Sequence, residues 1–127
     1  QNGTDALRKL GILDGVMVGR ATFGNPWVMA EIAAAFEGEP YVKPSWAEKL
    51  PWIARHLELS CAFKGEKWGI LEMRKHLAWY IRGFPFASEL RRKFMAVETM
   101  PEALTLLQEA FPSLEAASQE PRPALIA

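Results

Sequence analysis

Residues 66–82 read EKWGILEMRKHLAWYIR and stand between Gly65 and Gly83. At about 100° per residue, the apolar side chains of this stretch fall on one face of a helix and the cations on another. The apolar face comprises Ile70, Met73, Leu77, Tyr80 and Ile81, and the basic face comprises Lys67, Arg74, Lys75 and Arg82. This pattern predicts an amphipathic helix that packs its apolar face against other helices.

Further helices are expected on both sides of this one. Ser45 and Glu48 have the spacing of a capping box. The helix that they start is expected to run to about Phe63, with Pro51 as a kink or an early boundary. Residues 86–97 also carry apolar side chains at helical spacing. These segments together predict a small helical bundle.

A second capping box, Thr99 and Glu102, starts a last helix that is expected to end at Pro112. A flexible tail of small and polar residues is expected to follow it. The predicted organisation is a first section 1–38, a linker 39–44, a helical domain 45–111 and a tail 112–127.

A different pattern precedes the bundle. Residues 14–19, DGVMVG, form a short apolar run closed by glycine, which is typical of a strand buried on both faces of a parallel sheet. A single parallel strand would leave its backbone groups unpaired. We therefore expect residues 1–38 to be the end of a larger sheet or barrel, and the chain to be a fragment of a longer protein.

Short helices are expected on either side of this strand. Thr4 or Asp5 is expected to cap a helix over residues 6–10. The pair Asn25-Pro26 is a typical helix start, with asparagine as the cap and proline at the first helical position. The order helix, strand, helix is typical of a slice of an α/β protein.

Charge is distributed unevenly along the chain. Residues 1–40 hold three basic and five acidic groups (net −2), residues 41–100 eleven and six (net +5), and residues 101–127 one and four (net −3). The positive charge is therefore concentrated in the predicted bundle, where a polyanion would dock.

Aromatic side chains accompany this positive charge. Trp68 and Trp79 fall along one edge of the basic face, and Arg91, Arg92 and Lys93 form a second basic cluster on the next helix. Cations bind phosphates and indoles stack on exposed bases, so the combination suits RNA. The alternative is that both tryptophans are core contacts and the charges form a solvated surface.

Few residues suggest catalysis or metal binding. The lone Cys61 lies on the apolar face of its helix, where a buried, unreactive thiol is expected. His76 falls between the apolar and basic faces and is expected to be structural, and His56 has no acidic or cysteine partner at metal-ligand spacing. No metal site is expected. One cysteine, no long apolar run and no signal peptide favour a reducing compartment such as the cytoplasm and no membrane.

Gly19 and Arg20 follow the predicted strand directly and precede the predicted helix start. In barrel enzymes, backbone amides and a short helix after the last strands commonly bind phosphate. Glycine permits close approach and arginine adds a forked cation, although a structural role for Arg20 is an equal alternative.

Two stretches resemble one enzyme family. Residues 14–27, DGVMVGRATFGNPW, are similar to the last barrel strand and the following turn of bacterial tRNA-dihydrouridine synthases. Residues 73–80, MRKHLAWY, followed by GFP at 83–85 and ELR at 89–91, resemble the C-terminal helical domain of the B-type branch. The resemblance extends over residues 4–111.

The resemblance implies a cytoplasmic, monomeric oxidoreductase. Such an enzyme has an FMN-binding (β/α)8 barrel, the TIM barrel, followed by a helical bundle, and it reduces uridine in tRNA to 5,6-dihydrouridine with NADPH. Gly19 and Arg20 would bind the FMN phosphate. By this resemblance, Arg74, Lys75 and Arg91 would contact the tRNA backbone. The charge pattern described above adds Lys67, Arg82 and Arg92 to the expected RNA-binding residues.

By the same resemblance, the catalytic cysteine lies in an earlier barrel loop that this chain does not include, so no catalytic residue is expected here. Cys61 belongs to the helical domain and would not replace it. Two alternatives stay open: a stand-alone helical RNA-binding module, and another FMN-dependent barrel oxidoreductase of the dihydroorotate or enoate type. The basic face disfavours the latter, because small substrates need no polyanion-binding surface.

Overall fold

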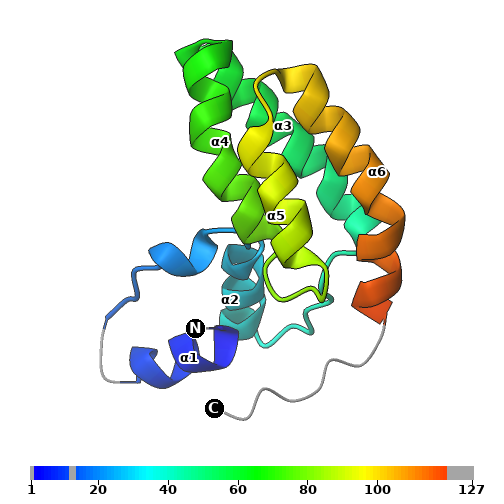
Figure 1. The fold of residues 1–127 in the computed structure, drawn as a ribbon. Coiled ribbons are helices and arrows are strands. Elements are labelled where there is room, and N and C mark those ends of the chain that lie inside the picture. The colour runs from blue at the N-terminus through cyan, green and yellow to red at the C-terminus, as the bar shows by residue number, and fades with distance from the viewer. Residues whose placement is uncertain (1, 12–13, 120–127) are drawn as a thin grey trace. The chain divides into compact units, whose positions relative to one another are not determined.

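The computed structural model describes residues 2–11 and 14–119, and within them all regular structure is helical (Figure 1). The elements are α1 (Gly3–Leu10), the short 3-10 helix η1 (Arg20–Thr22), α2 (Val28–Glu37), α3 (Trp46–Lys64), α4 (Glu66–Tyr80), α5 (Ala87–Ala96) and α6 (Met100–Gln119). The chain divides between Pro44 and Ser45 into two compact units.

The first unit is built on the contact between α1 and α2. α1 is capped by Asn2, whose side chain accepts a hydrogen bond from the backbone N–H of Asp5 at 3.0 Å. The prediction that Thr4 or Asp5 caps this helix is therefore wrong by two or three residues. The two helices approach closely at Gly3, where a Cβ atom would lie 2.8 Å from the Cβ of Ala35.

The start of α2 also differs from the expected one. The helix begins at Val28, and Asn25 provides its backbone carbonyl, rather than its side chain, to the N–H of Val28 at 3.2 Å. Asn25 and Pro26 thus belong to the turn before the helix. The helix ends at a glycine: Gly38 adopts a left-handed φ of 70°, and its backbone N–H donates to the carbonyls of Ala34 and Ala35.

Residues 14–19 do not form the predicted strand; they are irregular. Val16 and Val18 pack against the small core of Ala6, Val28 and Ile32, whereas Met17 between them is 94% exposed. A strand needs a neighbouring strand to accept its backbone hydrogen bonds, and the described residues contain none. The expectation that both faces of this stretch are buried is also wrong: Met17 is exposed, because the described residues supply no sheet that could cover it.

The second unit is a bundle of α3, α4, α5 and α6 (Figure 1). α3 packs against α4 and α6, and α5 packs against α4 and α6. Its core is continuous and almost wholly apolar. The side chains exposed by 2% or less are Trp46, Ile53, Leu57, Ile70, Met73, Leu77, Ile81, Phe94, Ala103, Leu107 and Leu114. The apolar face predicted for residues 66–82 is therefore confirmed, apart from the half-buried Tyr80.

The capping box of α3 is confirmed. Ser45 Oγ accepts from the N–H of Glu48 at 3.3 Å, and the N–H of Ser45 donates to Glu48 Oε2 at 2.8 Å. Pro51 lies inside the helix, which continues through it to Lys64. Pro51 is therefore not an early boundary.

α6 extends further than predicted. Thr99 Oγ1 accepts from the N–H of Glu102 at 3.3 Å, but the Glu102 carboxylate binds the N–H of Glu98 instead of completing the box. The helix passes through Pro112 and ends at Gln119, so the predicted end at Pro112 and the tail are wrong for residues 113–119. Burial of Leu114 favours the extra turns. Residues 120–127 of the predicted tail lie outside the described part.

Candidate nucleic-acid interface

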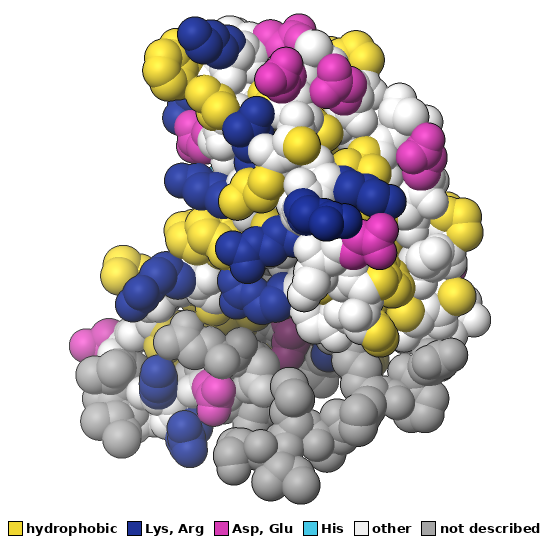
Figure 2. Space-filling model, viewed as in Figure 1, with side chains coloured by type: hydrophobic (Ala, Val, Ile, Leu, Met, Phe, Trp, Pro, Cys, Tyr) yellow, Lys and Arg dark blue, Asp and Glu magenta, His cyan; other side chains and the backbone are white. Residues whose placement is uncertain are grey.

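Basic side chains gather over α4 and α5 (Figure 2). Five of the six cations predicted to bind RNA are exposed: Lys67, Lys75, Arg82, Arg91 and Arg92. Without Arg74, and with Arg91 and Arg92 of α5 added, these five exposed residues are the basic face of the folded chain. Its members come from α4, from the turn that follows α4, and from α5. Packing of α5 against α4 places cations that are up to 25 residues apart in sequence on one unit.

Arg74 is the sixth predicted cation, and the structure gives it a different environment. Its side chain is half-buried, and Nε and Nη2 donate to the carbonyl oxygen of Val97 at 3.0 and 2.8 Å. Val97 is the C-terminal cap of α5. The arginine fork therefore joins α4 to the end of α5, where helix carbonyls lack partners within the helix.

The two tryptophans of α4 are in unlike positions. Trp68 is 63% exposed, and Lys67 Nζ lies 5.7 Å from the centre of its ring. Trp79 is half-buried and meets the ring of His76 edge-on, with ring centres 5.1 Å apart. Trp68 is therefore available to a ligand, whereas Trp79 belongs to a side-chain cluster between helices.

That cluster contains both histidines, a pairing that the sequence pattern did not predict. The rings of His56 on α3 and His76 on α4 lie 4.9 Å apart, and His56 Nδ1 is 3.0 Å from the hydroxyl of Tyr80. Burial lowers the pKa of each histidine, and for His76 the neighbouring His56 and Lys75 lower the pKa further. Both shifts disfavour the charged form of the two rings, which pack at the interface between α3 and α4.

Cys61 is half-buried, and burial, followed by the charge of Glu66, raises the pKa of its thiol. A raised pKa makes the thiol a poor nucleophile, as expected, although the side chain is half-buried rather than fully buried. Within the described residues, no group of three or more histidine, cysteine or acidic side chains is placed to hold a metal ion. None of the described helices is both long and apolar enough to cross a membrane.

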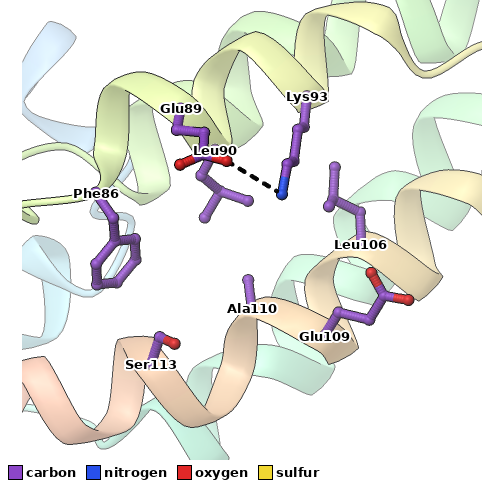
Figure 3. A pocket seen from close by; sticks show the side chains of 8 residues that line it. All are labelled: Phe86, Glu89, Leu90, Lys93, Leu106, Glu109, Ala110 and Ser113. Atoms are coloured by element: carbon purple, nitrogen blue, oxygen red, sulfur yellow. Dashed lines mark ion pairs between the residues drawn. The ribbon is translucent and has the colours of Figure 1, made fainter.

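A groove of about 210 Å³ lies between α5 and α6 (Figure 3). Leu90, Leu106 and Ala110 line it, and the ion pair of Lys93 with Glu89, 3.6 Å long, lies at its edge. Glu109 adds a second carboxylate to the lining. Because the lining holds two carboxylates and one already paired cation, this groove does not extend the basic face.

In the first unit, Gly19 and Arg20 form the start of η1. The carbonyl of Gly19 accepts hydrogen bonds from the backbone N–H of Thr22 at 3.0 Å and from its hydroxyl at 2.9 Å. A Cβ atom at Gly19 would meet nothing within 4 Å, and Arg20 is exposed. An anion therefore has open access to both residues.

Comparison with known proteins identifies the family. The model of the family described as "Dihydrouridine synthase (Dus)" matches residues 2–116. Over 109 residues the chain is 41% identical to the "Probable tRNA-dihydrouridine synthase" of Mycobacterium leprae, and over 95 residues 45% identical to that of Mycobacterium tuberculosis. Over 115 residues it is 36% identical to "tRNA-dihydrouridine synthase B" of Xanthomonas axonopodis pv. citri.

These matches cover 84%, 74% and 90% of this chain and 28%, 24% and 34% of the respective relatives. The chain belongs to the dihydrouridine synthase family. The resemblance inferred from residues 14–27 and 73–91 is thereby confirmed. The chain spans about a quarter to a third of the length of these relatives.

Proposed function

We propose that this chain is the C-terminal part of a flavin-dependent tRNA-dihydrouridine synthase, which reduces uridine in tRNA to 5,6-dihydrouridine with NADPH. The family match over residues 2–116 carries the proposal. In this proposal residues 1–38 complete a TIM barrel, and the bundle that follows holds the tRNA.

The basic face supports the role of the bundle. Its five exposed cations would contact the tRNA backbone, because phosphates dominate the affinity of such interfaces. Arg74 would act through the position of α5, to which its guanidinium is bonded. α5 carries Arg91 and Arg92, so its position determines where these two cations lie.

Gly19 and Arg20 support the second role. The open space at Gly19 and the exposed guanidinium of Arg20 fit a phosphate group, and in this proposal they hold that of FMN. Bound FMN would supply the hydride that reduces the uracil ring. The family resemblance assigns the proton donor to a cysteine in an earlier barrel loop, and the raised pKa of Cys61 disfavours a substitute role for it.

Titration of this chain with a tRNA transcript at several salt concentrations tests the tRNA proposal. We expect the logarithm of the affinity to fall linearly with that of the salt concentration. Alanine at Lys75, Arg91 or Arg92 should lower the slope by about 0.7 to 0.9 for each phosphate that is no longer neutralised. The matched control is Lys93→Ala, because Lys93 is paired with Glu89. Absence of binding at low salt would contradict the proposal.

The test of the FMN role requires the longer protein, because the chain spans only about a quarter to a third of its relatives and would share the proposed barrel with the rest. There, Arg20→Ala should weaken FMN binding by about 1.5–3 kcal/mol, the usual contribution of hydrogen bonds to charged groups, and leave tRNA affinity unchanged. The measurement is flavin fluorescence on titration of the apoprotein. A stand-alone RNA-binding module would bind tRNA yet show no response of FMN to Arg20.

A further inference from the structure

Two aromatic side chains stand exposed at the connection between α3 and α4. Phe63 is 88% exposed and Trp68 is 63% exposed. α3 ends at Lys64 and α4 begins at Glu66, so that Gly65 alone connects them, with a positive φ of 82° that favours glycine. We call residues 63–68 the hairpin tip.

The hairpin tip is held firmly. A Cβ atom at Gly69 would lie 2.7 Å from the Cα of Cys61, so α3 and α4 are in backbone contact there. Ser60 Oγ donates to the carbonyl of Gly69 at 3.3 Å, and Lys64 forms an ion pair with Glu72 across the two helices. The aromatic side chains therefore project from a rigid base, which lowers the entropy cost of binding.

The tip is also remote from the start of the bundle. α3 has 19 residues, so its last turn lies about 28 Å from Ser45, where the chain enters the bundle. Lys67 of the basic face lies at the tip, with its ammonium group over the Trp68 ring. Trp68 thus adjoins the basic face on α4, and Phe63 belongs to the last turn of α3, just before the Gly65 connection.

We propose that Phe63 and Trp68 stack on unpaired bases of the RNA that lies along α4. The proposal rests on the proposed tRNA binding and adds a contact that charge alone does not supply. Aromatic rings stack on bases of any sequence, and protein recognition of unpaired bases depends heavily on such stacking. Lys67 beside the Trp68 ring would reach the phosphate that adjoins the stacked base.

The test measures the affinity of the full chain for a tRNA transcript across a range of salt concentrations. Trp68→Leu and Phe63→Leu keep an apolar side chain but remove the ring, and each should weaken binding by about tenfold. Because every cation that neutralises a phosphate is retained, the salt slope should not change. Trp68→Phe keeps an aromatic ring and should retain most of the affinity.

Trp52→Leu is the matched control, because Trp52 is 66% exposed but lies in the second turn of α3, far from the tip. It should bind like the unaltered chain. A short single-stranded RNA should bind Trp68→Leu more weakly than it binds the unaltered chain. A blunt duplex of the same sequence has no unpaired base and should bind the two proteins equally.

Three results would overturn the stacking proposal without affecting the proposed tRNA binding. The first is full tRNA affinity in both Trp68→Leu and Phe63→Leu. The others are a loss of affinity in these variants that is no larger than in Trp52→Leu, and a change in their salt slope. Wild-type binding to anionic lipid vesicles that Trp68→Leu abolishes, with RNA affinity unchanged, would assign the tip to a membrane surface instead. Loss of concentration-dependent self-association in that variant, again with RNA affinity unchanged, would assign it to a second copy of the chain. No tRNA binding by the unaltered chain would overturn the proposed function as well.

Discussion

The guanidinium of Arg74 holds the carbonyl oxygen of Val97 with two hydrogen bonds, of 3.0 Å from Nε and 2.8 Å from Nη2. The two residues are 23 positions apart, on α4 and at the end of α5. These hydrogen bonds pair a carbonyl that has no partner within its own helix, and they connect the two helices that carry the basic face. Arg74, which the sequence pattern assigns to RNA binding, thus has a structural role in joining the two helices.

Arg74→Ala should lower the free energy of unfolding of the chain by about 1.5–3 kcal/mol, because it removes hydrogen bonds from a charged donor and leaves the carbonyl unpaired. Arg74→Lys should also destabilise, since an ammonium group lacks the fork that contacts the carbonyl twice. Urea unfolding measures both. The control Lys75→Ala removes an exposed neighbour and should change stability by less than about 0.5 kcal/mol. Equal effects of the Arg74 and Lys75 substitutions would contradict the framework role.

The histidine pair predicts a dependence of stability on pH. Burial lowers the pKa of His56 and His76 in the folded chain from the ordinary value of 6.5, so between the two values the unfolded chain binds more protons. The stabilising contribution is therefore complete above pH 6.5 and is lost as the pH falls below it. The negative charge of Glu72 raises the pKa of both histidines and so opposes this effect, whereas the positive charges of Lys75 and Lys64 lower the pKa of His76 further.

The measurement is urea unfolding of the chain over that pH range, with NMR titration of the two imidazoles. These are the only histidines in the chain, so the assignment is direct. Replacing both histidines by glutamine should flatten the dependence in this range. A midpoint at or above the ordinary histidine pKa for either ring would contradict the prediction.

Gly69→Ala should destabilise the bundle although alanine favours helices. The new Cβ would lie 2.7 Å from Cys61 Cα and 2.8 Å from the carbonyl oxygen of Ser60, both of which are backbone atoms. Such overpacking costs about 1–3 kcal/mol, of which the better helix propensity of alanine offsets up to about 1 kcal/mol. Thermal unfolding measures the difference. Gly15→Ala, where a Cβ meets nothing within 4 Å, is the control, and a stabilised Gly69 variant would refute the close helix contact.

Leu114→Ala should cost about 2–5 kcal/mol, the usual cost for a fully buried leucine. The side chain anchors the turns of α6 beyond Pro112, so their backbone amides should exchange with solvent more quickly in this variant. Hydrogen exchange on the unaltered chain should show protection at residues 114–118. Ser113→Ala is the neighbouring control because Ser113 is exposed. Rapid exchange of the amides of residues 114–118 in the unaltered chain would contradict this prediction and would favour a helix that ends at Pro112.

Some features of the fold could be predicted because they depend on neighbouring residues. The Ser45 and Glu48 hydrogen bonds join residues three apart, and the apolar face of α4 follows from helical spacing alone. Exposure of Lys75, Arg91 and Arg92 could be predicted for the same reason, since the opposite face of each helix carries the core residues.

Other features required partners that are distant in the chain. Residues 14–19 have the composition of a buried strand, but a strand forms only when another strand accepts its hydrogen bonds. Pro112 is a helix breaker by its local chemistry, yet packing of Leu114 in the bundle outweighs the hydrogen bond that proline removes.

The sequence by itself determined the helical bundle, its capping box, the concentration of positive charge within it and the family to which the chain belongs, because these depend on residue type and short spacing. Only the tertiary structure decided which side chains are available to a ligand. It placed Arg74 on Val97 and Trp79 against His76, and it left Trp68 exposed beside Lys67. The physical reason is that availability depends on contacts between helices, and these join residues that local patterns do not relate.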